Sequence, residues 1–402
     1  ASGQGPVATQ DADQAVRLDA ACVDAWEARA LVREALGTLD EAKDDIEKAI
    51  SLDGTLDRLY PTRARLRRAT GDAGGAAEDE DRCAQAFRPL ASKLLEEARG
   101  KAADEDYAAA AALAARAAWF DPGNVSSWRD RGFYRLKAGE AAGALEDLDR
   151  AVGIDPKNAD VLSQRAAVKK ALKDNAGAVE DWTSAIEIDA GRVDDRIARA
   201  GAYRALGQKE KALEDVNQAL SEKPDAVEGL KLRAILKNTA RDYAGAIEDA
   251  TRAIEVGGPD GWTYYQLGYA YDASGKRQEA AEAFTQAIQA KQDFADAYSH
   301  RGWVLLALGS PAPSRNDQFE AIRVNPSHAW AHFRLAAVYA SESAKGASSP
   351  LAGDGNLAAM AIAELGKAID SGFTSRSYLD ATKYFEPIRG LPEYQQLLSR
   401  LK

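Results

Sequence analysis

The side chains best suited to chemistry are three histidines and two cysteines. His300, His328 and His332 all lie in the last third of the chain. His328 and His332 are four residues apart, a spacing that can place two imidazoles on one side of a helix as zinc ligands. No HExxH motif accompanies them, and His332 also fits an aromatic position of the repeat described below. Cys22 and Cys83 form no CxxC unit, so the sequence favours two unpaired small residues over a zinc site, while one disulfide between them stays open.

Other catalytic motifs are missing from the sequence. It contains no P-loop, no GxSxG and no GxGxxG followed by a suitable helix. Acidic doublets such as Asp44–Asp45 and Glu146–Asp147 recur at a fixed interval, which is typical of solvated or ion-paired helix faces rather than of a general acid and base. We therefore predict no catalytic residue, no bound metal and no cofactor, and we expect that the chain is not an enzyme.

Composition limits the kind of partner and the compartment. A content of 46% hydrophobic and 29% charged residues suits a soluble folded protein. The net charge of −11 disfavours nucleic acid or an anionic membrane as the main partner. The Ala-rich run 107–120 is interrupted by Arg116 and is too short to span a bilayer, so no membrane insertion is expected. The first residue is Ala1 rather than Met, which favours an exported or periplasmic location over the cytoplasm without assigning it.

The elements that must hold any binding residues follow a 34-residue repeat. Ten units fit without insertion or deletion before the last, and they start at positions 23, 57, 91, 125, 159, 193, 227, 261, 295 and 329. A unit of this length has room for two helices of about a dozen residues and two turns. Position 8 is always Ala or Gly, and positions 20 and 27 are almost always Ala, so the paired backbones can approach closely. Position 15 is Gly in six units, where the first helix must end.

Two charged positions change together along the repeat. In seven units position 7 is Arg and position 23 is Asp, and the pairs are Arg29–Asp45, Arg63–Asp79, Arg131–Asp147, Arg165–Asp181, Arg199–Asp215, Arg233–Asp249 and Arg301–Asp317. Where position 7 is Glu97 or Leu267, position 23 is Leu113 or Ala283. We predict an ion pair between the two helices of each of the seven units.

The pattern resembles the tetratricopeptide repeat. The closest unit reads Tyr264, Leu267, Gly268, Tyr271, Ala280, Phe284 and Ala287, and the resemblance covers about residues 23–373. It implies an all-α fold, a right-handed superhelical solenoid of antiparallel helix pairs. Residues 1–22 would form an N-terminal tail and capping helix, and residues 374–402 would form C-terminal capping helices. The last unit carries an insertion at 341–356, which we interpret as a flexible loop or as a loop that grips a partner.

The resemblance also implies a concave groove lined by positions 2, 5, 6, 9, 12 and 13 of each first helix. In units two to seven the basic residues at these positions outnumber the acidic ones. The basic residues are Arg58, Arg65, Arg68, Arg99, Arg129, Lys137, Lys170, Arg204 and Lys231. This surface would suit acidic segments or a chain-terminal carboxylate, although ordinary solvated charges explain it equally well. The family's carboxylate-clamp residues are not matched, because Phe133, Asp194 and Ala198 stand at three of the required positions.

The groove of units eight to ten is aromatic instead. The candidate partner-binding residues are Trp262, Tyr265, Tyr269, His300, Trp303, Trp330, Phe333 and Arg334, with Arg129, Phe133 and Lys137 as further candidates in an earlier unit. Clustered Trp, Tyr and Arg side chains are typical anchors of protein interfaces. The alternative is that the C-terminal cap or the 341–356 loop folds over the aromatic rings.

We therefore expect a non-catalytic scaffold that binds a protein or an extended peptide along the groove. The alternative is that the chain is the substrate-presenting or docking part of a larger enzyme. The oligomeric state is left open.

Overall fold

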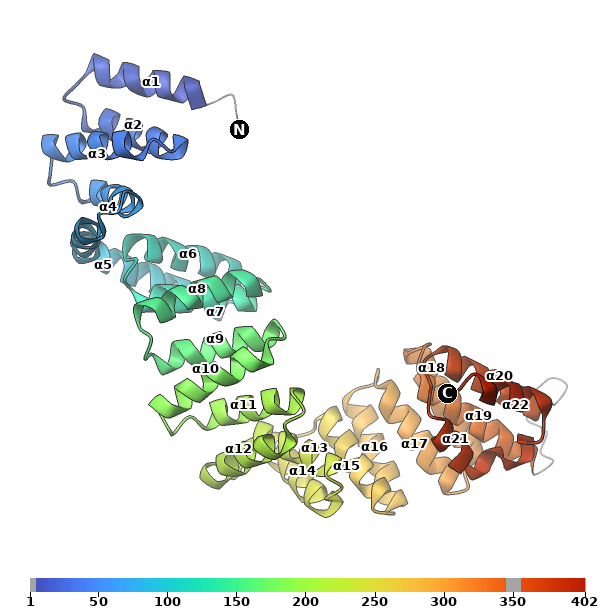
Figure 1. Ribbon diagram of the computed structural model, residues 1–402. Coiled ribbons are helices and arrows are strands. Elements are labelled where there is room, and N and C mark those ends of the chain that lie inside the picture. Colours follow the sequence, from blue (N-terminus) through green and yellow to red (C-terminus); the bar gives the residue numbers. More distant parts are fainter. Residues whose placement is uncertain (1–4, 345–355, 402) are drawn as a thin grey trace. The chain divides into compact units, whose positions relative to one another are not determined.

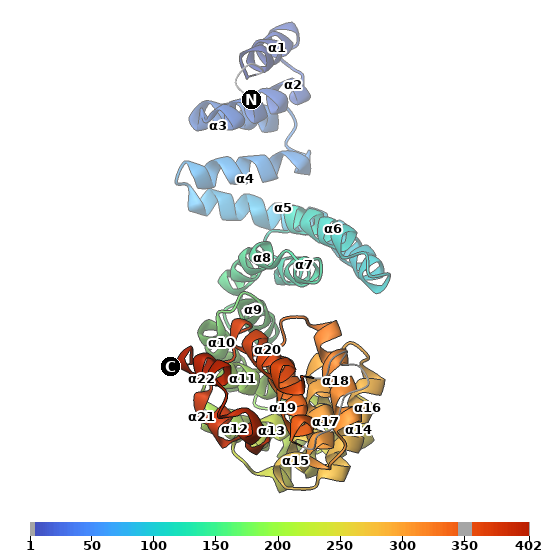
Figure 2. The same cartoon turned by 90° about the vertical axis from the view of Figure 1, so that its right-hand side faces the viewer.

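The computed structural model describes residues 5–344 and 356–401, and every regular element among them is a helix. The chain forms two compact units, residues 1–202 and 203–402. Within each unit, consecutive helices pack in pairs, and the paired helices lie side by side in both views (Figures 1 and 2). The all-α architecture of paired helices is therefore confirmed.

The first unit consists of α1 (Gly5–Leu18), α2 (Val23–Leu36), α3 (Leu39–Leu52), the 3-10 helix η1 (Asp57–Leu59), α4 (Tyr60–Ala69), α5 (Ala73–Ala103), α6 (Tyr107–Phe120), α7 (Val125–Lys137), α8 (Ala141–Ile154), α9 (Ala159–Ala171), α10 (Asn175–Ile188) and α11 (Val193–Ala205), in which the unit boundary falls. α1 packs against α2. Most first helices begin at the residue where a 34-residue unit starts, as α2, α7 and α9 do.

The second unit continues with α12 (Lys209–Glu222), α13 (Val227–Thr239), α14 (Tyr243–Gly257), α15 (Gly261–Ala273), α16 (Arg277–Ala290), α17 (Ala295–Ala307), α18 (Pro311–Val324), α19 (Ala329–Ser343), α20 (Leu357–Asp370), α21 (Arg376–Ala381), η2 (Lys383–Ile388) and α22 (Pro392–Ser399). η2 packs on α19 and α22 packs on α20. The expected insertion at 341–356 lies largely outside the described residues. The division into ten repeats with two capping segments stays a prediction.

Local backbone chemistry sets the helix ends. The side chains of Asn and Asp residues cap several helices, as where Asn158 accepts a hydrogen bond from the backbone N–H of Val161 at 3.2 Å. Position 15 adopts a left-handed backbone whether or not it is glycine: Gly139 has a φ of 88°, and Lys173 has a φ of 69°. Glu105 and Arg241 occupy the same position of their repeats, and both also have a positive φ.

The core is built from the small residues of the repeat. Ala30, Ala42 and Ala49 of the first full repeat have no exposed surface. Where position 8 is glycine, position 24 holds a side chain that needs the space: a Cβ on Gly268 would lie 2.8 Å from Phe284. Small residues at positions 8, 20 and 27 and a larger side chain at position 24 thus fit together in most helix pairs by close packing.

One junction differs from the expected helix–turn–helix plan. α5 continues through position 91, where the third repeat starts, so the second helix of repeat two and the first helix of repeat three form one helix of 31 residues. The segment 84–90 lacks the Asp, Gly and Asn residues that make the turn at 121–124. Pro89 lies inside the helix and interrupts one backbone hydrogen bond without ending it.

The predicted ion pairs are confirmed in six of the seven units. In each of the six, the arginine Nε donates to one oxygen of the aspartate at 2.8 or 2.9 Å, and its Nη2 donates to the other oxygen. The aspartates are buried, with 1% of Asp147 and 6% of Asp317 exposed. We call this contact the brace. Arg199 and Asp215 belong to one repeat, but the boundary between the two compact units falls between them, and their pair stays a prediction.

The brace arginine makes a further bond that the sequence analysis missed. The Nη1 group of Arg165 donates to Asp149 at 2.9 Å, and that of Arg301 donates to Thr285 at 3.1 Å. In both cases the acceptor lies on the second helix of the preceding repeat. The brace aspartate commonly takes a second cation from position 11, as where Arg135 lies 3.0 Å from Asp147. The brace therefore joins two successive repeats as well as two helices.

The brace predicts a stability effect at Arg63. The hydrogen bond to Asp79 raises the pKa of Arg63 above its ordinary value. We expect Arg63→Ala to lower the free energy of unfolding of the first unit by about 3 kcal/mol, because it leaves a buried carboxylate with one cation fewer. Chemical denaturation followed by helical circular dichroism measures this loss. The control is Arg88→Ala, whose side chain is 63% exposed and lies 3.9 Å from Asp121, and which should leave the midpoint unchanged. An unchanged midpoint in Arg63→Ala would contradict a structural role for the brace.

Candidate partner-binding surface

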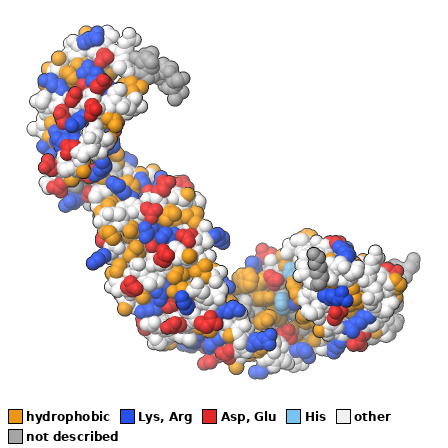
Figure 3. Space-filling model, viewed as in Figure 1, with side chains coloured by type: hydrophobic (Ala, Val, Ile, Leu, Met, Phe, Trp, Pro, Cys, Tyr) orange, Lys and Arg blue, Asp and Glu red, His pale blue; other side chains and the backbone are white. Residues whose placement is uncertain are grey.

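Most of the aromatic residues expected to bind a partner lie on three first helices of the second unit. These helices, α15, α17 and α19, contact one another in sequence order. Position 2 of a first helix carries Trp262 on α15 and Trp330 on α19, and position 9 carries Tyr269 and Trp303. Figure 3 shows hydrophobic and histidine side chains gathered on one face of this unit.

The α15 end of this surface is an open cluster of rings. Trp262 is 52% exposed and packs at 4.7 Å between ring centroids on Phe294. Tyr265 lies at 5.1 Å from Phe294 and at 5.2 Å from the His300 ring. Tyr269 is 39% exposed. Phe294 is almost fully buried and supports the cluster from below; the sequence analysis did not include it, because it precedes the first helix of its repeat.

The α19 end is partly covered by the C-terminal segment. Phe333 stacks on Phe373 at 4.6 Å and has no exposed surface, so we leave it out of the binding surface. Trp330 packs against Tyr378 at 5.1 Å but is still 37% exposed. Trp303 meets Tyr384 of η2 at 5.5 Å. The C-terminal cap thus covers Phe333 and leaves other rings open, and the role of the open rings as anchors stays a prediction.

We call the partly accessible rings the aromatic surface: Trp262, Tyr265, Tyr269, Trp303, Trp330 and Tyr378. The sequence analysis missed Tyr378, which lies on α21 outside the repeats. Only its position after the last repeat, in a segment expected to fold back as a cap, could have indicated it. Arg334 lies between the indoles of this surface, with its Cζ atom 5.9 Å from the Trp303 ring and 5.8 Å from the Trp330 ring. Burial lowers the pKa of Arg334.

His300 is held by the surface as a neutral imidazole. Its Nδ1 lies 2.9 Å from the carbonyl oxygen of Asp296 and 3.3 Å from the hydroxyl oxygen of Tyr265. Burial lowers the pKa of His300 to about 3, with the charge of Arg334 adding to the effect. Burial also raises the pKa of Tyr265. Both groups are uncharged at neutral pH, so the α15 end of the surface is apolar despite its polar atoms.

The candidate binding residues of the first compact unit already contact other side chains of that unit. Arg129 donates to Asp130 at 2.7 and 2.9 Å, and the Lys137 ammonium lies 5.5 Å from the Phe133 ring. Arg65 pairs with Glu34 at 2.8 Å, and Arg68 with Glu80 at 2.6 Å. Several basic residues expected to attract acidic segments are thus neutralised by acids of their own unit. This finding weakens the basic character that the sequence suggested for this groove.

The other two histidines have structural partners, and the two cysteines are unpaired. His328 Nε2 lies 3.1 Å from Asp296, and His332 is hydrogen-bonded to Glu364 at 2.6 Å and to the Pro326 carbonyl at 3.0 Å. Cys22 and Cys83 are both free thiols. Burial raises the pKa of Cys83 to about 12, which makes its thiol unreactive.

The described residues 5–344 and 356–401 contain no group of three or more side chains placed to hold a metal ion. Over the same residues, no helix is long and apolar enough to cross a membrane.

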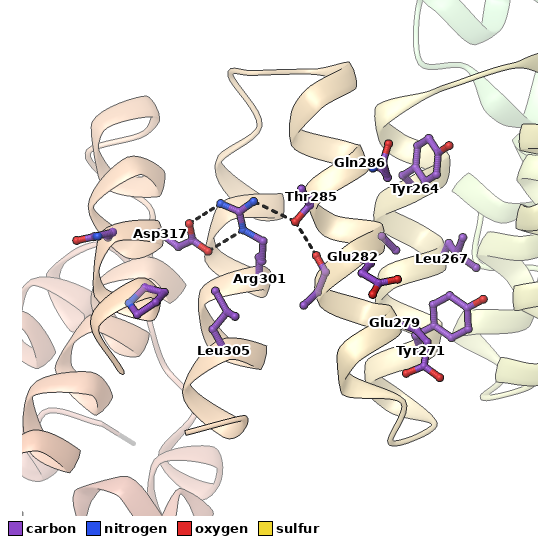
Figure 4. A pocket seen from close by; sticks show the side chains of 14 residues that line it. Tyr264, Leu267, Tyr271, Glu279, Glu282, Thr285, Gln286, Arg301, Leu305 and Asp317 are labelled. Atoms are coloured by element: carbon purple, nitrogen blue, oxygen red, sulfur yellow. Dashed lines mark hydrogen bonds and ion pairs between the residues drawn. The ribbon is translucent and has the colours of Figure 1, made fainter. Parts of the chain in front are cut away.

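A separate hollow of about 860 Å³ lies beside α16 (Figure 4). Leu267 and Tyr271 line it at positions 7 and 11, which carry cations in braced repeats. Arg301, hydrogen-bonded to Asp317 and Thr285, forms one side of the hollow. The hollow thus lies where repeat eight lacks the brace. Among the described residues that line it, none has a buried polar atom without a partner.

The partly buried imidazole of His300 predicts a pH effect on the second unit. The folded pKa of His300, about 3, lies below its ordinary value of 6.5, so the unfolded chain binds more protons and stability falls as the pH drops from 6.5 toward 3. We expect the ring signals of His300 in an NMR titration to stay unchanged between about pH 8 and pH 5. The melting temperature of His300→Phe should fall less over this range than that of the parent chain. A His300 midpoint near its ordinary value would contradict this environment.

Comparison with known proteins agrees with this architecture. Family models of the tetratricopeptide repeat match residues 23–55, 100–173, 197–225 and 265–322, which lie in both compact units. No curated protein sequence matches the chain. Among solved structures, a tetratricopeptide repeat protein from Parabacteroides merdae is 19% identical, with a TM-score of 0.49 over 61% of this chain and 97% of that one. Yeast Tom70 is 13% identical, with a TM-score of 0.42 over 98% of this chain and 96% of that one. These structures have TM-scores below 0.5 and carry no argument about function. The family matches lie on helix pairs of both compact units, and the chain is therefore a tetratricopeptide repeat protein.

Proposed function

We propose that this protein is a non-catalytic scaffold that binds an extended segment of a partner protein on the aromatic surface of its second unit. The observation that carries the proposal is the exposure of Trp262, Tyr269 and Trp330 on the first helices of repeats eight and ten. Large aromatic side chains dominate the binding energy of protein interfaces. Trp303 on α17 lies between these rings in helix order, because α17 contacts both α15 and α19.

The exposure of these rings is not a general property of the repeat. Other exposed apolar side chains recur at fixed positions near helix ends: Leu36, Leu172, Leu206 and Leu308 at position 14, and Leu52, Ile154 and Ile188 at position 30. Those residues belong to the repeat pattern itself. Exposed rings also occur at Trp119, Phe133 and Phe319, but the six rings of the aromatic surface gather on the last repeats and the C-terminal segment, which supports a specific role there.

A protein partner fits the chemistry of the surface better than a nucleic acid does. The chain carries a net charge of −11, and the His300 and Tyr265 side chains are neutral. Apolar side chains of a partner would displace water from the rings. A non-catalytic role is supported by the structural engagement of the histidines and by the raised pKa of the Cys83 thiol.

The double variant Trp262→Ala, Tyr269→Ala tests the proposal. We expect it to weaken partner binding at least tenfold, because it removes two exposed anchors while leaving Phe294 and the core in place. The measurement is quantitative capture of cross-linked partner from the native host by the chain of residues 1–402.

A matched control in the same unit is Leu308→Ala, Val256→Ala. Both side chains are 41% exposed and lie outside the aromatic surface. Circular dichroism checks that both double variants stay folded. Equal capture by the two variants and the parent chain would refute the proposed binding surface.

A further inference from the structure

The brace aspartate of repeat nine has one cation fewer than the other five. In those five repeats a Lys or Arg at position 11 contacts the Oδ2 atom of the aspartate, at distances between 2.6 and 3.1 Å. In repeat nine position 11 is Leu305, and Oδ2 of Asp317 receives only the Nε donor of Arg301, at 2.9 Å, among the described residues. The Asp317 side chain is 8% exposed, against 2–6% for the other five. Its Oδ2 atom therefore has room for a second cation.

This oxygen belongs to the wall of the hollow beside α16. Asp317 and Leu305 both line the hollow, whose volume is about 860 Å³ (Figure 4). Repeat eight contributes Leu267, Tyr271 and Ala283, which stand at the positions where braced repeats commonly carry two cations and an aspartate. The hollow therefore places a largely apolar lining beside one buried carboxylate.

The charges around the hollow favour a cation as its ligand. Three carboxylates line it, those of Glu279, Glu282 and Asp317. The guanidinium of Arg301 is the one cationic group among the described lining residues. Both glutamates are exposed on α16, so they attract a cation that approaches Asp317 and repel an anion. The apolar lining suits the aliphatic stem of a Lys or Arg residue, which packs on apolar surface while its charged group reaches a carboxylate.

We propose that the hollow receives a Lys or Arg side chain of a partner protein, whose charged group binds Oδ2 of Asp317 as the position-11 cation does in the five other repeats. The aliphatic stem packs on Leu267 and Leu305. The hollow shares no residue with the aromatic surface, so the proposal goes beyond the function proposed above. Position 7 of α15 points away from positions 5 and 9, because two residues correspond to about 200° of rotation in an α-helix. The second unit therefore offers a partner two sites, on different sides of α15.

An NMR titration of the chain of residues 1–402, labelled with ¹⁵N-arginine, tests this assignment. Three probes separate the possible ligands: N-acetyl-leucyl-lysinamide carries a basic side chain, N-acetyl-leucyl-norleucinamide carries its uncharged analogue, and butylammonium is a free cation without a peptide. We expect the lysine probe to shift the Arg301 Nε–H signal at millimolar concentrations and to bind at least tenfold more tightly than the other two. The Nε–H signal of Arg233 is the control, because Asp249 already pairs with Lys237 at 2.9 Å, and it should stay fixed.

Three outcomes of the titration would overturn the proposal. An Arg301 signal that does not respond to the lysine probe excludes binding of a basic side chain in the hollow. An equal response to the norleucine probe shows that the hollow binds apolar groups without regard to charge. Equal affinity for butylammonium identifies a free organic cation, rather than a side chain of a partner protein, as the ligand.

The variant Leu305→Lys separates a cation-binding role from a structural one. It places an ammonium group at position 11, as Lys237 does in repeat seven, so it should abolish the response to the lysine probe and leave the melting temperature equal or higher. The matched control is Leu308→Lys, which adds the same charge at a side chain that is 41% exposed and outside the hollow, and which should leave probe affinity unchanged. Unchanged probe binding in Leu305→Lys, or a melting temperature below that of Leu308→Lys, would contradict the proposal.

Discussion

The ion pair between an arginine of the first helix and an aspartate of the second is the contact on which the repeat structure depends. Small residues let the helices approach, but alanine against alanine fixes neither register nor rotation. A buried carboxylate does fix them, because it is stable only where the guanidinium meets it. The third donor of Arg165 or Arg301 extends the constraint to the preceding repeat. Each braced repeat is thereby positioned against its neighbour by geometry as well as by apolar contact.

Much of this framework is visible in the sequence because the repeat supplies its own comparison. Arg and Asp vary together between units, which predicts their contact before any coordinates exist. The bond to the preceding repeat could also have been predicted from the sequence, because a polar residue such as Asp149 or Thr183 stands sixteen positions before most brace arginines. The continuous helix α5 was also indicated, by the absence of turn-forming residues before Pro89. These omissions concern signals present in the pattern but not used.

The binding surface was less predictable, for a physical reason. Position in the repeat identifies which rings face the groove, but exposure depends on what folds back over them. Phe333 and Trp330 have similar positions by periodicity, yet Phe373 covers the first completely and leaves the second partly open. The covering residues come from the non-repetitive C-terminal segment, so no periodic signal places them. The surface thus forms where the regular array ends and an irregular cap begins.

The left-handed residues at the ends of the first helices have a consequence for engineering. Glu105, Lys173 and Arg241 hold a conformation that costs a non-glycine residue roughly 1 kcal/mol, and their side chains are exposed. Nothing in the packing therefore requires those side chains. The three positions are far apart in the sequence, so their strain should add independently. These three positions are therefore sites at which the thermal stability of the chain could be increased. They lie in turns well separated in the sequence from the aromatic helices.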